Sequence, residues 1–286
     1  MSSERVFITG GTGKVGSLVV QELIKRNVQV TVYARTPEKI AQHPNVTVVQ
    51  GDVTDLTPFE KAIPGHTRLF LLVAVGVPDA SRIKANIAEK AYAAGVKQIV
   101  DLAAIRVPWR SYPLLHVHEV SEQLIYNIPN RGYFVSLRPT NFMSNTAYYR
   151  VETIKNQDTI IDSAEPDDLQ EWVSTQDIAE VTANIFVDPV EKHSDAAYEL
   201  IGDLITPTRR AEILTKALGR PITYKQLPVQ ELYELYLEQS KSHDIAFYAS
   251  TFRRSNPVYR GMALLLHREP EDYEAWAIKN KDSFLQ

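Results

Sequence analysis

The chain has 286 residues, no cysteine and a formal net charge of −4 at pH 7. This length suits one large α/β domain or a core domain with a smaller appendage. The lack of cysteine excludes disulfides, thiolate catalysis and cysteine-ligated metals, and the charge gives no support for nucleic-acid binding. No apolar run approaches the ~20 residues of a membrane span, and a strand begins too early to leave room for a signal peptide, so we expect a cytoplasmic protein.

A glycine-rich turn follows the first predicted strand, residues 5–9, and precedes a predicted helix over residues 17–26. Gly10, Gly13 and Gly16 can supply, in turn, a tight bend, a backbone that a pyrophosphate can approach, and a small residue where the helix meets the strand. The N–H groups at the start of the helix would then face the phosphates. An ordinary strand-to-helix turn is the alternative, but the place at the head of a βαβ unit favours dinucleotide binding.

The second predicted strand, residues 29–34, is followed by Arg35, where a dinucleotide-binding fold meets the adenosine ribose. An acidic residue there would favour a 2′-hydroxyl, whereas a guanidinium can pair with a 2′-phosphate, so Arg35 favours NADP(H) over a solvated arginine. A third strand, residues 45–50, leads to Asp52. This carboxylate could accept from the adenine amino group, cap the helix that begins near Leu56, or do both.

The middle of the chain continues the alternation of strands and helices. A continuous apolar strand over residues 68–75 ends at Gly76, a helix over 80–94 ends at Gly95, and a strand follows over 96–104. A loop over 107–114 leads to a helix over about 116–127 and then to a strand over 133–138, which Pro139 ends. This alternation predicts a doubly wound α/β fold with a parallel sheet of the Rossmann type.

The alternation loosens beyond Pro139. We expect a helix over 178–187 with Ser174 or Thr175 as its N-cap, a strand over 196–201, and a helix over 207–218 that stops at Gly219. The remainder, from residue 230, is rich in predicted helix. We therefore predict a dinucleotide-binding core over 1–150 and a mixed region over 151–286, in which about 171–202 complete the core and about 203–286 form a helix-rich substrate or lid subdomain.

The order and spacing of several motifs resemble one protein family over nearly the whole chain. They comprise residues 9–16 (TGGTGKVG), 51–53, 116–122, 137–145, 174–179, 197–202 and 218–221. The chain resembles the NmrA-like branch of the atypical short-chain dehydrogenase/reductases, which includes triphenylmethane reductase and the NAD(P)H quinone oxidoreductase 2 type. The resemblance implies an NADP(H)-binding oxidoreductase.

The resemblance also implies a set of coenzyme contacts. Thr12, Lys14 and Val15 would follow the pyrophosphate, Arg35 would hold the 2′-phosphate, and Asp52 and Val53 would border the adenine. The nicotinamide end would be flanked by residues from four segments: Ala74, Val75, Gly76, Ala103, His118, Thr140, Asn141 and Phe142.

The chain departs from the Ser-Tyr-Lys set that many relatives use. The strand that would present the serine ends in Leu102-Ala103-Ala104, and Tyr112 has His116, not lysine, four residues later. His118 stands where the branch places a lysine or histidine beside the nicotinamide ribose. We predict that it binds the ribose and relays a proton, and that His116 faces elsewhere. The alternative is a surface histidine paired with Glu122.

Aromatic residues give the candidate substrate pocket. Trp109, Tyr112, Phe142, Tyr148 and Tyr149 would line it or belong to the core, and Tyr112 is also the best available proton donor. The carboxylates Glu165, Asp167, Asp168 and Glu171 are predicted to form a solvated acidic loop, and no spacing of His, Asp and Glu predicts a metal site.

Two functional hypotheses follow. The first is an NADPH-dependent reductase that transfers hydride to an electron-poor small organic acceptor, such as a quinone, an iminium, or a conjugated or aromatic compound, without a Ser-Tyr-Lys set. The second is a sensor that binds NADP(H) and regulates a partner protein, for which Tyr248, Phe252 and Tyr259 in the C-terminal segment could form the contact surface. A homodimer stays open under both hypotheses.

Overall fold

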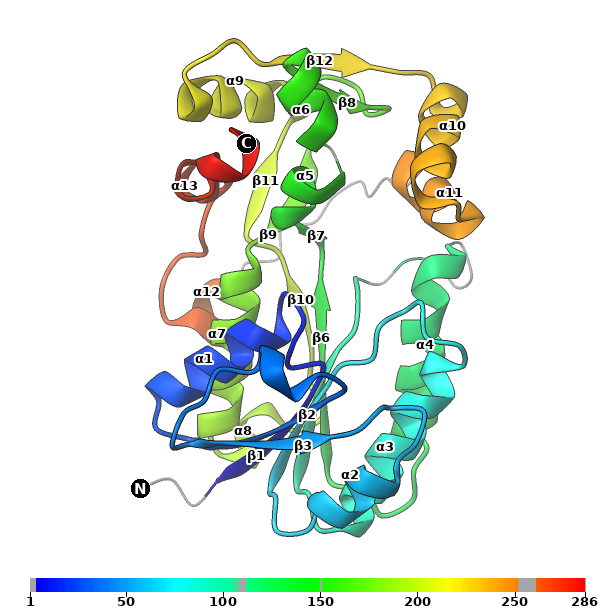
Figure 1. The fold of residues 1–286 in the computed structure, drawn as a ribbon, viewed down its shortest axis with the longest axis vertical. Helices are drawn as coiled ribbons and strands as arrows, with labels where there is room; N and C mark the ends of the chain where they lie inside the picture. Colours follow the sequence, from blue (N-terminus) through cyan, green and yellow to red (C-terminus); the bar gives the residue numbers. More distant parts are fainter. Residues whose placement is uncertain (1–3, 106, 108–111, 150, 252–260, 286) are drawn as a thin grey trace.

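A seven-stranded sheet forms the centre of the computed structural model, which describes residues 4–105, 107, 112–149, 151–251 and 261–285 (Figure 1). The strand order is β10-β6-β5-β4-β1-β2-β3, and every neighbouring pair is parallel. The strands are β1 Arg5–Thr9, β2 Gln29–Ala34, β3 Val46–Gln50, β4 Arg68–Leu71, β5 Gln98–Leu102, β6 Tyr133–Pro139 and β10 Ala197–Leu200. The predicted doubly wound α/β fold is confirmed. The strand order reverses between β1 and β4, and ligands bind at this point in such sheets.

Helices cover both faces of the sheet. Alternate residues of β1 explain why, because Val6 and Ile8 belong to one apolar cluster and Phe7 to the other. The first cluster includes residues of α1 Gly16–Lys25, α7 Thr175–Val187 and α12 Gly261–Leu266. The second includes residues of α2 Thr57–Ala62, α3 Ala80–Ala93 and α4 Pro113–Tyr126.

Most of the chain after Pro139, which we call the C-terminal part, lies beyond the carboxyl ends of the parallel strands, whereas β10, α7 and α12 belong to the core (Figure 1). It holds a three-stranded sheet of β7 Asn141–Phe142, β9 Gln170–Val173 and β11 Asp203–Ile205, and a pair of β8 Thr159–Asp162 with β12 Thr223–Gln226. Helices α10 Val229–Ser240 and α11 His243–Thr251 pack together, and α11 also contacts α4. The other helices are η1 Pro37–Lys39, α5 Ser144–Tyr149, α6 Val151–Gln157, α8 Val190–His193, α9 Pro207–Leu218, α13 Tyr273–Lys279 and η2 Lys281–Phe284.

Local signals set several boundaries as predicted. Ser174 caps α7 by accepting a hydrogen bond from the Gln176 amide, and Gly219 ends α9 in a left-handed conformation with φ of 67°. Gly95 likewise has φ of 96° after α3. These ends depend on single residues, so the sequence alone predicts them.

Other boundaries differ from prediction. β4 ends at Leu71, four residues before the end of the apolar run, because the Leu72 amide bonds to the side-chain hydroxyl of Thr9 in β1 instead of a backbone carbonyl. Helix α4 begins at Pro113, whose fixed φ suits the first turn, and not near His116. The short strands β7, β8, β9, β11 and β12 were not predicted. In the part of the chain that the structure describes, no helix has the length and hydropathy to cross a membrane.

Candidate functional site

The glycine turn joins β1 to α1 at the point where the strand order reverses. Gly10 has φ of 70°, and its carbonyl accepts a hydrogen bond from the Gly13 amide at 3.0 Å. A Cβ on Gly10 would stand 2.6 Å from Cδ2 of Leu72, and a Cβ on Gly16 would overlap the Gly10 carbonyl. The predicted bend at Gly10 and the close approach at Gly16 are confirmed, because no larger side chain fits without a shift.

The start of α1 is open to an anionic ligand. Thr12, Gly13 and Lys14 are exposed, Val15 is buried, and no side chain caps the helix N-terminus within the described residues. Partial burial lowers the pKa of Lys14. Such a helix start favours phosphate through its free amides and its dipole. The phosphate contacts of these residues stay predictions.

Arg35 and Asp52 lie together at the carboxyl ends of β2 and β3. Arg35 Nε is 3.6 Å from Asp52 Oδ2, and 79% of the Arg35 side chain is exposed. Asp52 Oδ1 accepts hydrogen bonds from the amide and hydroxyl of Thr54, and these, with a smaller effect of Arg35, hold the pKa of Asp52 below its usual value. The guanidinium is therefore available to a further anion.

The turn that carries Asp52 and Val53 is fixed by Tyr33. The Tyr33 hydroxyl lies 3.0 Å from the Asp52 carbonyl and 2.9 Å from the Asp55 carbonyl, and the Tyr33 ring occupies the place of a side chain on Gly51. Helix α2 begins at Thr57, whose amide donates to Asp55. The alternative that Asp52 caps this helix is therefore wrong, and its proposed place beside an adenine stays a prediction.

Three further segments reach the same edge of the sheet, since β4, β5 and β6 are neighbours. Ala74, Val75 and Gly76 are exposed after β4, and Ala103 is buried after β5. Thr140 is buried after β6, where its hydroxyl donates to the Leu200 carbonyl. Asn141 and Phe142 are half-buried in β7. The fold thus brings together the residues predicted for the nicotinamide end, although no ligand contact tests them.

His118 lies on α4 with one ring nitrogen inside the protein. Its Nδ1 is fully buried and has no hydrogen-bond partner among the residues that the structure describes. Burial, followed by the charge of Lys84, places the pKa of His118 well below its usual value. The ring is therefore neutral, with Nδ1 able to accept or donate one hydrogen bond.

The alternative pairing of His118 with Glu122 is wrong. Glu122 instead accepts from the Ser136 hydroxyl and from Arg138, at 2.9 Å from Nε and 2.5 Å from Nη2. The Glu122 carboxylate, 7% exposed, is fully engaged by β6 and cannot fix the imidazole. His116 pairs with Glu119 at 3.4 Å, and its orientation away from the coenzyme stays a prediction.

Lys84 and Asp101 were not predicted as part of the site. Both side chains are fully buried, Lys84 Nζ lies 2.7 Å from Asp101 Oδ1, and Nζ donates to the Leu102 carbonyl at 3.0 Å. The available signal was an aspartate within the apolar run of β5, because a buried carboxylate needs a partner. The sequence does not name that partner, which comes from α3.

Tyr112 joins α4 to the C-terminal helices. It precedes the first residue of α4, its hydroxyl donates to the Thr251 carbonyl at 3.2 Å, and its ring packs against Phe247 and Tyr248. Its roles as proton donor and substrate contact stay predictions. Trp109, Phe252 and Tyr259 lie outside the described residues, as do the side chains of Tyr148 and Tyr149.

The predicted acidic loop is correct only in part. Glu165, Asp167 and Asp168 are exposed, but Glu171 is buried because it lies in β9, which was not predicted. Across the described ranges, no three His, Asp or Glu residues gather as metal ligands.

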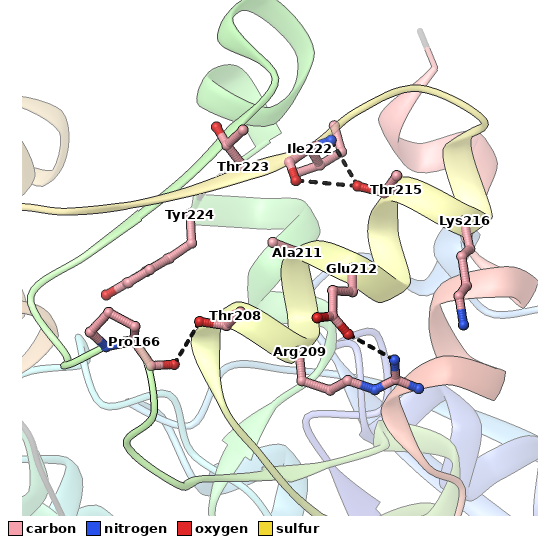
Figure 2. A pocket seen from close by; sticks show the side chains of 10 residues that line it. All are labelled: Pro166, Thr208, Arg209, Ala211, Glu212, Thr215, Lys216, Ile222, Thr223 and Tyr224. Atoms are coloured by element: carbon pink, nitrogen blue, oxygen red, sulfur yellow. Dashed lines mark hydrogen bonds and ion pairs between the residues drawn. The ribbon is translucent and has the colours of Figure 1, made fainter.

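An open pocket of about 630 Å³ lies in the C-terminal part, between α9, β12 and the loop at Pro166 (Figure 2). The polar side chains around it are engaged with the protein: Thr208 donates to the Pro166 carbonyl, Arg209 pairs with Glu212, and Thr215 bonds to Ile222. It is away from the glycine turn (Figure 1) and holds no unpaired reactive group, so we do not assign the reaction to it.

These features define a class of protein: a doubly wound α/β protein with a glycine turn and an uncapped helix start at the switch point of its sheet, and an exposed arginine at the end of the neighbouring strand β2. The NmrA-like family model matches residues 2–260. The chain therefore belongs to the NmrA-like family.

Individual relatives span most of the chain. The prestalk A differentiation protein A of Dictyostelium discoideum is 25% identical over 95% of this chain and 91% of its own length, and quinone oxidoreductase 2 of Escherichia coli is 26% identical over 78% and 77%. Among solved structures, triphenylmethane reductase of Citrobacter sp. complexed with NADP(H) has a TM-score of 0.79 at 22% identity, covering 96% of this chain and 99% of its own. The negative transcriptional regulator NmrA in complex with NADP has a TM-score of 0.76 at 16% identity, covering 97% and 95%.

Proposed function

We propose that the protein is an NADPH-dependent reductase that transfers hydride to an electron-poor small organic acceptor. The observation that carries the proposal is the presence of the glycine turn and of Arg35 at the same edge of the sheet, where the parallel strands end. The tight glycine turn and the uncapped start of α1 fit a pyrophosphate, and the exposed guanidinium of Arg35 fits a 2′-phosphate. Quinone oxidoreductase 2 and an NAD(P)H azoreductase among the relatives support this class.

The coenzyme would supply the hydride, and the protein's own residues would bind, orient and exclude water. The residues after β4 and β6 would flank the reacting ring, and the neutral imidazole of His118 would bind the adjacent ribose. The Tyr112 hydroxyl is engaged with Thr251, and β5 ends in alanines. Acceptors that take hydride without concerted protonation, such as quinones, iminium ions and conjugated or aromatic dyes, fit this arrangement.

The experiment is NADPH oxidation, followed by the loss of its absorbance, against a panel of quinones, triarylmethane dyes, azo compounds and activated alkenes. The proposal predicts turnover with at least one acceptor and a preference for NADPH over NADH. Tight NADPH binding without turnover of any acceptor would overturn it.

The second candidate function is an NADP(H)-dependent sensor that regulates a partner protein. The engaged Tyr112 hydroxyl favours it, because a sensor needs no proton donor. The likeness to the transcriptional regulator NmrA supports the fold only. Equal affinity for NADP⁺ and NADPH, no turnover and a partner recovered by pull-down would establish this function in place of the first.

A further inference from the structure

Two ion pairs are buried beneath the carboxyl ends of β5 and β6. Lys84 of α3 pairs with Asp101 of β5, and Arg138 of β6 pairs with Glu122 of α4. Buried pairs add little net stability, because desolvation of both charges offsets their attraction. Their place below the candidate nicotinamide end calls for a functional account.

The contacts of Lys84 hold the last residue of β5. Its ammonium forms an ion pair with Asp101 Oδ1 at 2.7 Å and donates a hydrogen bond to the Leu102 carbonyl at 3.0 Å, so it acts on two adjacent residues of the strand. Ala103, predicted to contact the coenzyme, follows Leu102 directly. Lys84 thereby fixes this strand end against α3.

The same ammonium acts on His118. Helix α3 packs against α4, and the charge of Lys84 adds to burial in lowering the pKa of His118. A proton on the buried Nδ1 would place a second positive charge near Lys84 without a partner. Asp101 balances the charge of Lys84 but does not touch the imidazole in any described contact.

We propose that Lys84, anchored by Asp101, is a positioning residue of the coenzyme site, which fixes the carboxyl end of β5 and keeps His118 a neutral hydrogen-bonding group beside the nicotinamide. This inference rests on the proposed reductase function. A neutral His118 matters because the nicotinamide ring becomes cationic when it gives up hydride, and an imidazolium beside it would oppose that charge. Lys84 acts through its neighbours and needs no contact with coenzyme or substrate.

Other charged groups face this region from the surrounding elements. Glu122 of α4 and Arg138 of β6 pair with each other, and α11, which contacts α4, carries His243 and Asp244 in its first turn. Among the described residues, the charge that lowers the pKa of His118, after burial, is that of Lys84, so the test changes Lys84 and leaves these other groups in place.

The test compares three full-length variants. Lys84→Met with Asp101→Asn removes both charges of the pair and leaves no buried carboxylate unpaired. Lys84→Arg keeps the positive charge and is the rescue variant. Lys90→Met is the matched control, because Lys90 lies on the same helix but pairs with Glu60 at the surface. If the double variant does not fold, Lys84→Gln with Asp101→Asn removes both charges and keeps a donor for the Leu102 carbonyl.

The first readout is the ¹⁵N NMR titration of His118, distinguished from the other six of the seven histidines by the spectrum of His118→Gln. The wild type, Lys84→Arg and Lys90→Met should share one His118 titration, with a midpoint well below that of an ordinary histidine, and in the charge-removed variant the midpoint should rise by about half a pH unit or more. An unchanged midpoint in the folded variant would overturn the inference.

The second readout is the pH profile of kcat with a quinone acceptor. As the pH falls, kcat of the charge-removed variant should begin to decline at a pH about half a unit or more higher than kcat of Lys90→Met, because His118 gains its proton at a higher pH in that variant. A profile that matches the control would contradict the inference even if kcat fell uniformly, since that result would indicate only a structural role. If no acceptor is turned over, the reductase proposal fails, and the NMR titration still decides whether Lys84 controls His118.

Discussion

Arg35 and Asp52 face each other across the ends of neighbouring strands, with 3.6 Å between Nε and Oδ2. The pair is loose and exposed, so it contributes little to stability. Asp52 has a second set of partners in Thr54, which leaves Arg35 free to turn toward another anion. We therefore expect this one exposed arginine to select between the two coenzymes.

Arg35→Glu should weaken NADPH binding about 100-fold and NADH binding less than about fivefold, because it removes a charge-assisted partner of the 2′-phosphate and adds repulsion. Titration of intrinsic fluorescence with each coenzyme measures both dissociation constants. Lys281→Glu, an equal charge change at an exposed C-terminal site, should leave both unchanged. Equal loss of affinity for the two coenzymes would show that Arg35 does not bind the 2′-phosphate.

Gly16→Ala should abolish measurable NADPH binding, because the new Cβ would overlap the Gly10 carbonyl and force the turn open. Gly132→Ala is the matched control: its Cβ would overlap the Lys97 carbonyl, at the amino end of β6. Each clash should cost about 1–3 kcal/mol of stability, measured by urea denaturation. Retained coenzyme affinity in Gly16→Ala would contradict the role of the turn.

Features that neighbouring residues determine can be predicted from this sequence, whereas features that depend on contacts between distant segments cannot. Gly10, Ser174 and Gly219 act on their own backbone, and their turn, cap and helix end follow from local rules. The strands β7, β9 and β11 could not be predicted, because each is short and pairs only with segments far along the chain.

The residues of the candidate site likewise fall into those that local sequence predicts and those that it does not. The glycine turn and Arg35 follow from a compact βαβ motif. The Lys84–Asp101 pair joins a helix to a strand, and Glu122 turns from His118 to Arg138 because β6 presents a guanidinium to it. These choices depend on packing between elements, which residue spacing does not record.

Tyr112→Phe tests whether the phenol donates a proton. Because the hydroxyl is engaged with the Thr251 carbonyl, we expect kcat to stay within about threefold and stability to fall by about 1 kcal/mol, while the ring keeps its contacts with Phe247 and Tyr248. Steady-state kinetics with a quinone acceptor and thermal melting measure the two effects. A loss in kcat of about 100-fold or more, with KM unchanged, would instead establish Tyr112 as the general acid.

His66 should make stability depend on pH. It is buried, its Nδ1 is 2.9 Å from the Ile63 carbonyl and its Nε2 is 2.8 Å from the Thr31 hydroxyl, so the neutral ring donates at Nδ1 and accepts at Nε2. Burial, the largest cause, lowers the pKa of His66 in the folded state. The unfolded chain therefore binds more protons as the pH falls below about 6.5, and stability falls with it, by at most about 1.4 kcal/mol per pH unit for each such histidine.

Thermal melting between about pH 7 and 5, above the range in which most carboxylates titrate, measures this effect. The wild-type Tm should fall, and the fall should be smaller in His66→Gln. The control His43→Gln, at an exposed loop position, should keep the wild-type slope. A wild-type Tm that is constant over this range would contradict the neutral, buried state of His66.

We propose that the site at the switch point of the sheet transfers hydride from NADPH. The most direct test is NADPH oxidation by the purified full-length protein with a panel of quinones, dyes and activated alkenes. We predict turnover with at least one acceptor, a preference for NADPH over NADH, and the loss of that preference in Arg35→Glu. Tight binding of NADPH with no oxidation by any acceptor would contradict it.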